Sequence, residues 1–242
     1  ITNLSSVNQP LIDYFQAGGL INVMVSWKNP WNGGNQNNLS GASNLIDIIT
    51  IGHPANTVFK SDLDSIAKGF QQLQDSGVTV IFRPLHEMNG SWFWWGNSMT
   101  HTPSDYFHVW QYIFHYMTIN KNLHNILWMY SPNVKYTGTG PGLKDELYFY
   151  PGDSLVDIIG LDSYNDTLDI PNYNAIIATG KTQITTDDIR DIVGILHEYE
   201  VRTRRKDLGH DRNVAIKYGG RNINVAKIGS RIRDRVEINK KT

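Results

Sequence analysis

The hydrophobic residues of the first 180 positions gather in short, almost unbroken runs. Four of these runs are candidates for buried strands: Leu20–Ser26, Val78–Phe82, Asn125–Tyr130 and Val156–Leu161. They are rich in Val and Ile, and they lack the alternation of apolar and polar residues that marks a half-exposed strand. Uniformly apolar strands are typical of a parallel sheet covered by helices. The pattern therefore predicts such a sheet.

Two stretches between these runs have the spacing of amphipathic helices. The clearer one covers Ser61–Asp75, and its apolar residues recur at intervals of three and four: Leu63, Ile66, Phe70 and Leu73. Gly77 follows it as a stop signal. The second extends from about Pro103 to Thr118, with Ser104 at a good N-cap position. Strands that alternate with helices predict an α/β fold, either a doubly wound sheet or a (β/α)8 barrel.

Polar and aromatic residues follow each of the four runs at its carboxyl end. These clusters are Trp27–Asn29, Arg83–Glu87, Ser131–Asn133 and Asp162–Asn165. Barrel enzymes build their active sites from the carboxyl ends of several strands, whereas a dinucleotide-binding sheet would show a glycine-rich turn after its first strand. The clusters favour a TIM-barrel type of (β/α)8 fold, either incomplete or with an atypical C-terminal segment.

Charge divides the chain into two parts. The 242 residues carry a net charge of −1, but residues 1–180 have a balance of −7 and residues 181–242 a balance of +6. We therefore expect a barrel region over 1–180 and a different, basic segment over 181–242. With 40% hydrophobic residues and no cysteine, the composition excludes a disordered chain, a disulfide scaffold and a thiolate metal site. No apolar run is long enough to suggest a membrane span.

The segment 82–96, FRPLHEMNGSWFWWG, combines a carboxylate with a run of aromatic residues. Glu87 comes just after a predicted strand, and the aromatic residues 92–95 follow within eight positions. Four consecutive aromatic residues could belong to the core, but neighbours on a strand or helix cannot all face inward. An exposed Trp beside polar groups indicates a carbohydrate site. The zinc motif HExxH fails because Gly90 takes the place of the second His, and we expect neither a metal nor a cofactor.

This segment closely resembles the acid/base segment of glycoside hydrolase family 26, the β-mannanase-type retaining enzymes. Three further motifs carry the resemblance: GGLINVMVSWKNP, HYMTINKNLHNILWMYSPN and YPGDSLVDIIGLDSYND. It covers roughly residues 10–187 in uninterrupted order. The resemblance implies a (β/α)8 barrel and the hydrolysis of β-linked polysaccharides.

The resemblance also implies roles for individual residues. Glu87 matches the general acid/base, and His86 before it would help to order the site. Trp92 matches the aromatic residue beneath the sugar next to the scissile bond. Tyr164, in GLDSY, matches the tyrosine that hydrogen-bonds the nucleophile, and Trp27 is expected to contact substrate.

The nucleophile is the point at which the sequence departs from the family. The family expects a segment like GKPFALTE, and GKTQITTD aligns with it without a gap, so Asp187 takes the place of the glutamate. Asp is one methylene shorter, and a misplacement near 1 Å can slow a reaction about a hundredfold. Asp187 and Asp188 also open a predicted amphipathic helix, where carboxylates favour the helix dipole. Both interpretations, nucleophile and helix cap, stay open.

The resemblance ends after Asp187. Residues Asn213–Tyr218 and Asn222–Ile228 alternate around Gly219–Gly220 and predict a β-hairpin, which does not complete a parallel barrel. The basic residues of this segment include Arg202, Arg204, Arg205 and Lys206. No aromatic residues are interleaved with them for base stacking, so we expect a solvated surface and no nucleic-acid partner.

These observations lead to one principal hypothesis and one alternative. The principal hypothesis is a retaining, endo-acting glycoside hydrolase of β-1,4-mannan, with Glu87 and Asp187 as its two carboxylates. Lys28, where mannan-cleaving relatives usually place a His, keeps β-glucan and β-xylan open as substrates. The alternative is a catalytically impaired carbohydrate-binding relative without the nucleophile glutamate. We expect a secreted monomer that binds a polysaccharide and neither nucleic acid nor a membrane.

Overall fold

We describe a computed structural model of the chain, which divides into two units, Ile1–Gln183 and Ile184–Thr242. The structure describes residues 4–42, 44–97, 101–135 and 142–164 of the first unit. In the second unit it describes 215–218 and 221–224. Among these residues no helix is long and apolar enough to cross a membrane.

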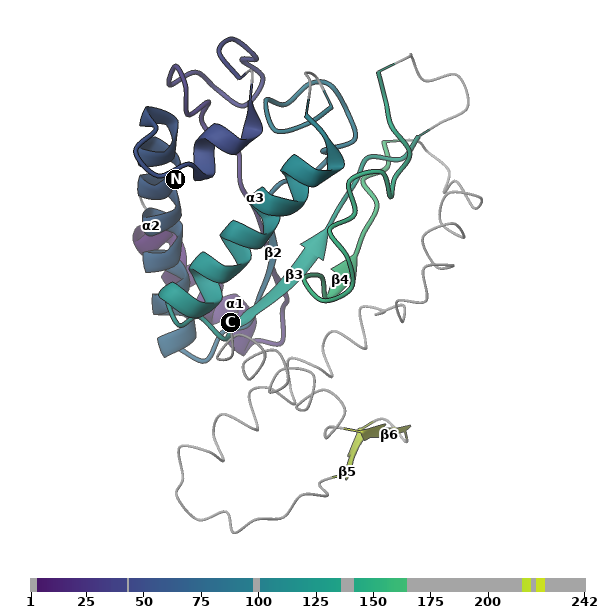
Figure 1. Cartoon of the computed structure of the whole chain (residues 1–242). Coiled ribbons are helices and arrows are strands. Elements are labelled where there is room, and N and C mark those ends of the chain that lie inside the picture. Colours follow the sequence, from purple (N-terminus) through teal and green to yellow (C-terminus); the bar gives the residue numbers. More distant parts are fainter. Residues whose placement is uncertain are drawn as a thin grey trace. The chain divides into compact units, whose positions relative to one another are not determined.

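The first unit contains a four-stranded parallel sheet (Figure 1). Its strands are β1 (Ile21–Met24), β2 (Val80–Arg83), β3 (Ile126–Tyr130) and β4 (Ile158–Ile159), paired in chain order. In register, Ile21 lies opposite Val80, Val80 opposite Ile126, and Met129 opposite Ile158. All four predicted strands and their parallel pairing are confirmed. The described strands form an open sheet, so the structure supports a parallel α/β fold and does not display a closed barrel.

Helix α2 (Pro54–Asp75) begins seven residues before the predicted start at Ser61. Pro54 occupies the first turn, and Nδ1 of His53 accepts a hydrogen bond from the backbone of Ala55 at 3.2 Å. Pro at this position lacks only a donor that the helix does not use, so it suits a helix start. The helix ends where predicted, because Gly77 adopts a left-handed φ of 71°.

Helix α3 (Pro103–His115) is capped by Thr102 and not by the predicted Ser104. The Thr102 hydroxyl accepts from the backbone of Asp105, and the Asp105 carboxylate accepts from the backbone of Thr102, which forms a capping box. The chain then continues as a π-helical turn, η2 (Tyr116–Asn120). Within this helix His108 is exposed and His115 is half-buried.

Two further helices have no counterpart in the sequence prediction. Helix α1 (Leu4–Gln16) packs against α2, where the buried amide of Asn8 donates to the carbonyl of Gly69 at 3.0 Å and to the side chain of Gln72 at 2.8 Å. A short 3-10 helix, η1 (Leu45–Ile49), buries Leu45 and Ile48. In the second unit, β5 (Ala215–Tyr218) and β6 (Arg221–Asn224) pair antiparallel and confirm the predicted hairpin.

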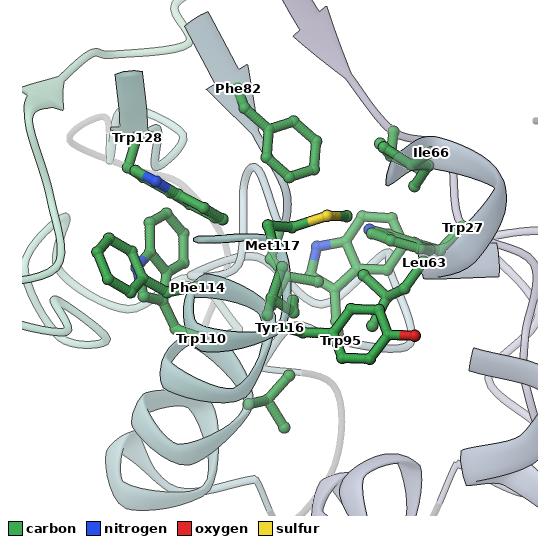
Figure 2. Packing of buried hydrophobic residues seen from close by; sticks show 14 of the residues in the cluster. Trp27, Leu63, Ile66, Phe82, Trp95, Trp110, Phe114, Tyr116, Met117 and Trp128 are labelled. Atoms are coloured by element: carbon green, nitrogen blue, oxygen red, sulfur yellow. The ribbon is translucent and has the colours of Figure 1, made fainter. Parts of the chain in front are cut away.

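Aromatic rings join the helices to the sheet (Figure 2). The ring centroid of Phe70 in α2 lies 5.0 Å from that of Phe82 in β2. The Phe82 centroid lies 5.5 Å from that of Trp128 in β3. On the other side of Trp128, Phe114 of α3 packs at 5.0 Å. Such ring pairs contribute about 0.5–1.5 kcal/mol each beyond the area that they bury. This continuous packing holds the carboxyl ends of β2 and β3 in fixed places, and those ends carry the site.

Candidate active site

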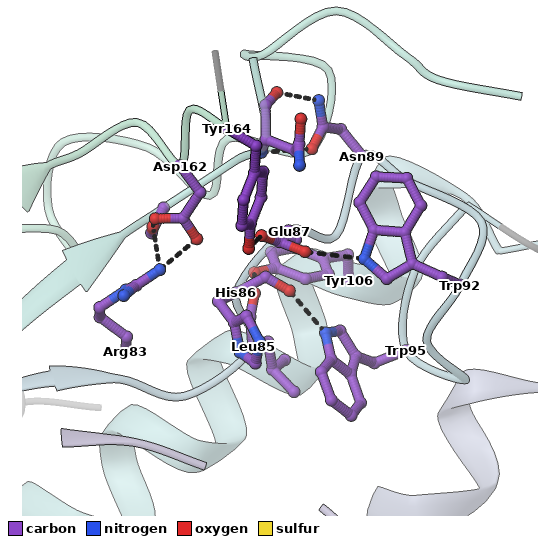
Figure 3. Close-up of polar contacts among 12 residues, drawn as sticks. Arg83, Leu85, His86, Glu87, Asn89, Trp92, Trp95, Tyr106, Asp162 and Tyr164 are labelled. Carbon is purple, nitrogen blue, oxygen red and sulfur yellow. Dashed lines mark hydrogen bonds and ion pairs between the residues drawn. The ribbon is translucent and has the colours of Figure 1, made fainter. Parts of the chain in front are cut away.

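The carboxyl ends of β2, β3 and β4 bring together polar residues from three of the predicted clusters (Figure 3). Glu87 follows β2, Ser131 follows β3, and Asp162 and Tyr164 follow β4. The backbone of Glu87 donates to the carbonyl of Ser131 at 2.7 Å, which ties the turn after β2 to the end of β3. The sequence therefore placed these residues at the correct edge of the sheet.

Three aromatic side chains hold the backbone that leads to Glu87. The indole of Trp27 donates to the carbonyl of Pro84, the hydroxyl of Tyr106 to that of Leu85 at 3.0 Å, and the indole of Trp95 to that of His86 at 2.8 Å. Each donor comes from a different part of the chain: the segment after β1, helix α3 and the turn itself. Because three successive carbonyls are satisfied in this way, the turn is held although it belongs to neither helix nor strand.

Glu87 itself has a left-handed backbone with φ of 51°, which is uncommon for a residue other than Gly. Its side chain is buried, and both carboxylate oxygens accept hydrogen bonds (Figure 3). Trp92 Nε1 donates to Oε2 at 2.8 Å, and the Tyr164 hydroxyl donates to Oε1. Backbone strain of this kind costs about 1–3 kcal/mol and is concentrated at functional sites, so the conformation of Glu87 supports a role for its carboxylate.

The described residues show a contact of Tyr164 with Glu87, and they do not test the contact with the nucleophile that the resemblance implies. The expected partner is the nucleophile, and its candidate, Asp187, lies outside the described residues. In the structure the Tyr164 hydroxyl binds Glu87 while the side chain is 76% exposed. This hydrogen bond, more than burial, raises the pKa of Tyr164 to about 12, so the phenol keeps its proton at neutral pH and acts as a donor.

An ion pair lies beside Glu87. Arg83, the last residue of β2, pairs with Asp162 and donates to the Ser131 hydroxyl at 2.7 Å, and that hydroxyl donates to Asp162 at 3.0 Å. Burial raises the pKa of Asp162, and the charge of Arg83 and the Ser131 hydrogen bond oppose that rise. Both oxygens of Asp162 are engaged, which indicates that it orders this edge of the sheet. The prediction named these three residues only as members of polar clusters.

His86 and Trp27 are buried and face the interior. His86 is 5% exposed, and its ring centroid lies 4.9 Å from that of Phe93. Burial, and secondarily the charge of Arg83, lowers the pKa of His86 to about 4, so its ring is neutral at pH 7. Trp27 is fully buried, and its ring centroid lies 4.9 Å from that of Phe59. Its placement corrects the expectation that it contacts substrate, because its ring packs in the core and its N–H donates to the carbonyl of Pro84.

The aromatic run also differs from the expectation in part. Phe93, Trp94 and Trp95 are all buried, and only Trp92 is half-buried. Three neighbours can face inward because the segment is a series of turns and bends, to which the alternation rule for strands does not apply. Trp92 is the residue of this run whose indole N–H meets the Glu87 carboxylate, and its contact with a sugar stays a prediction.

The sequence did not reveal the contacts of Tyr106 and Trp95 with the backbone that leads to Glu87. Both act through a polar tip on a buried ring, and no spacing along the chain indicates which carbonyl that tip meets. Within the described ranges, no group of three His, Asp or Glu side chains is placed to hold a metal ion.

Comparison with known proteins gives a consistent result. The sequence profile of glycosyl hydrolase family 26 matches residues 2–204. Over 184 residues the chain is 37% identical to a mannan endo-1,4-β-mannosidase of Caldalkalibacillus mannanilyticus, which covers 72% of this chain and 34% of that protein. A Bacillus subtilis mannanase structure matches with a TM-score of 0.64 and 34% identity, over 73% of this chain and 53% of that one.

A third similar protein was solved with a ligand. It is a β-mannanase from a symbiotic protist of the termite Reticulitermes speratus, complexed with gluco-manno-oligosaccharide, with a TM-score of 0.59 and 28% identity over 72% of this chain and 52% of that one. The chain thus spans between a third and about half of the length of these relatives. The profile match covers most of the chain, and the chain belongs to glycosyl hydrolase family 26.

Proposed function

We propose that the protein is an endo-acting glycoside hydrolase that cleaves β-1,4-mannan with retention of configuration. The observation that carries this proposal is the environment of Glu87, whose buried carboxylate lies at the carboxyl edge of the sheet. One of its oxygens accepts a hydrogen bond from Trp92 and the other accepts one from Tyr164. A carboxylate with ordered donors and a half-buried indole beside it suits a general acid/base next to a sugar ring. The mannosidase relatives support mannan as the substrate.

In the proposed reaction Glu87 is the general acid/base and Asp187 is the nucleophile. The Asp187 carboxylate attacks the anomeric carbon while the glycosidic C–O bond breaks and Glu87 gives its proton to the leaving oxygen. Glu87 then takes a proton from water, and the water oxygen displaces Asp187 from the anomeric carbon. The second step restores both carboxyl groups to their starting states.

We also propose that these parts sit on a (β/α)8 barrel. Four strands pair in parallel and in chain order, and helices lie in the connections from β1 to β2 and from β2 to β3, as in the repeating strand–helix unit of such a barrel. Active sites of barrels lie at the carboxyl ends of the strands, which is where Glu87, Asp162 and Tyr164 lie. Secretion and a monomeric state remain part of the proposal.

The decisive experiment compares Glu87→Ala with the matched variant Glu146→Ala, which removes another buried glutamate. Glu87→Ala should lower the rate on mannan about 10²–10⁴-fold. An aryl β-mannoside with a good leaving group should still form its intermediate at a nearly normal rate, because that step needs no proton. Glu146→Ala should affect both substrates alike. Equal slowing of both substrates by Glu87→Ala would refute the assignment.

A second experiment separates the enzyme from the carbohydrate-binding alternative, which rests on Asp at the position of the nucleophile. If Asp187 is the nucleophile, Asp187→Glu should raise the rate on mannan or on mixed-linkage β-glucan by about tenfold or more, since it restores the missing reach. If the unaltered protein binds mannohexaose in a calorimetric titration without cleaving it, and Asp187→Glu brings no turnover, the alternative holds.

A further inference from the structure

We propose that Gly90 is a positioning residue for Glu87: the absence of a side chain at position 90 lets the indole of Trp92 lie over the turn and direct its N–H at the carboxylate. The inference rests on the proposed function for its effect on rate, but the contact itself is a property of the folded chain. The sequence had singled out Gly90 only because it interrupts a zinc-binding motif.

The space at Gly90 is filled by the Trp92 ring. A Cβ atom at position 90 would lie 2.1 Å from Cη2, 2.3 Å from Cζ2 and 2.4 Å from Cζ3 of that indole. Heavy atoms in contact are separated by about 3.5–4.0 Å, so a methyl group and the ring cannot both occupy their places. The φ of Gly90 lies outside the left-handed range, and its backbone conformation is open to other residues. The indole therefore imposes the requirement for glycine.

Hydrogen bonds hold the backbone of both Gly90 and Trp92 in place. The N–H of Gly90 donates to the carbonyl of Glu87 at 3.1 Å, and the carbonyl of Gly90 accepts from Asn97 at 2.7 Å. The carbonyl of Trp92 accepts from the Asn37 amide at 3.1 Å. With both chain segments tied, a side chain at 90 can be accommodated only if the indole turns away.

Turning the indole away would remove the donor from Glu87. Trp92 Nε1 lies 2.8 Å from Oε2, and the indole is part of the same turn that carries the acid (Figure 3). The proposed catalysis then loses a fixed carboxylate orientation, and a displacement near 1 Å can cost about a hundredfold in rate. Gly90 thus acts through Trp92 and does not touch the substrate.

A double-mutant cycle tests this proposal. Gly90→Ala should lower kcat on soluble β-mannan about 10–100-fold, with a smaller change in KM. When Trp92→Ala is already present, adding Gly90→Ala should change kcat less than about twofold, because the ring that the methyl group displaces is gone. If the two losses simply multiply, Gly90 does not act through Trp92 and the proposal is wrong.

Gly19→Ala is the matched control. Its Cβ would also meet an aromatic ring, that of Tyr14, at 2.2–2.5 Å, again at a φ outside the left-handed range. It should destabilise the protein without lowering kcat per folded molecule. If Gly90→Ala loses activity only in proportion to its loss of folded protein, the role is structural and the proposal fails. If Gly90→Ala does not fold, the double variant with Trp92→Ala should fold again, and failure to do so also refutes it.

One measurement separates this proposal from the proposed function. The indole N–H resonance of Trp92, assigned with Trp92→Phe in a ¹⁵N-labelled sample, should move upfield in Gly90→Ala as the hydrogen bond to Glu87 is lost. This result is expected whether or not mannan is cleaved. An unchanged resonance would overturn the role of Gly90, while an inactive but correctly shifting protein would overturn only the proposed function.

Discussion

The two donors that hold Glu87 belong to regions built in opposite ways. Trp92 lies half-buried in the long turn between β2 and α3, with its ring over Gly90 and its carbonyl bound by the Asn37 amide. Tyr164 follows the two-residue strand β4 and is 76% exposed. The turn is ordered by packing and aromatic donors, whereas the β4 end contains the Arg83–Asp162 ion pair. The comparison suggests that packing fixes one side of the carboxylate and polar contacts fix the other.

The largest stability effect is expected at the β4 end. Arg83→Met leaves the largely buried carboxylate of Asp162 without its cation and should lower the free energy of unfolding by about 3 kcal/mol. Lys135→Met breaks the exposed pair with Asp145 and is the control, with a loss of at most about 0.5 kcal/mol. Urea unfolding at pH 7 measures both. Equal losses would mean that the Arg83 pair does not order this region.

Acid should weaken the turn through His86. Its pKa in the folded protein is about 4, below the value of about 6.5 for an unfolded chain. Between these values the unfolded chain takes up a proton that the folded protein does not, so stability falls as the pH falls. The expected loss is about 2 kcal/mol between pH 7 and pH 5.

His86→Gln is the comparison for this acid effect. The substitution removes the titrating group, so the difference in unfolding free energy between the variant and the unaltered protein isolates the histidine from Asp162 and other carboxyls. The variant should lose markedly less stability on going from pH 7 to pH 5. A parallel pH dependence in both proteins would contradict the neutral, buried state of His86.

Removing the hydroxyl of either of two buried tyrosines should cost less stability, and only one of the two variants should also lose kcat. Tyr106→Phe and Tyr130→Phe each remove a hydroxyl that donates to a backbone carbonyl, that of Leu85 or of Glu146. Each should cost about 1–2 kcal/mol, because a buried carbonyl is left unsatisfied. Only Tyr106→Phe should also lower kcat on mannan, since Leu85 leads into Glu87. If both variants keep full kcat, the aromatic donors do not position the acid.

The smallest stability effect is expected at Tyr164. Tyr164→Phe removes one donor from the buried Glu87 carboxylate and should lower kcat. Because the Tyr164 side chain itself is mostly exposed, the loss in the free energy of unfolding should stay at about 1 kcal/mol. Trp92→Phe removes the other donor and should cost more stability, because part of its ring is packed. Equal stability losses would erase the difference between the two sides of Glu87.

Much of this arrangement was readable from local sequence. Uniform apolar runs predicted the four parallel strands, and the polar clusters after them predicted that Glu87 and Tyr164 lie at the same edge of the sheet. Both inferences depend on near neighbours: a strand is recognised from consecutive residues, and parallel strands end at a common edge. The hairpin β5–β6 was predictable for the same reason, from alternation around two glycines.

Tertiary structure decided what each aromatic and charged side chain meets. Trp27 donates to Pro84 and Tyr106 to Leu85, across separations of 57 and 21 residues, and neither partner is encoded in local spacing. The same holds for Arg83 with Asp162, 79 residues apart. The sequence by itself determined the strands and the placing of Glu87 and Trp92 in one segment after β2, because these follow from periodicity and chain order, while the roles expected of the two residues came from the resemblance to the family. The burial of Trp27 and the left-handed turn at Glu87 arise only when segments distant in the sequence pack together, and the need for Gly90 arises only when the folded turn brings the Trp92 ring back over it.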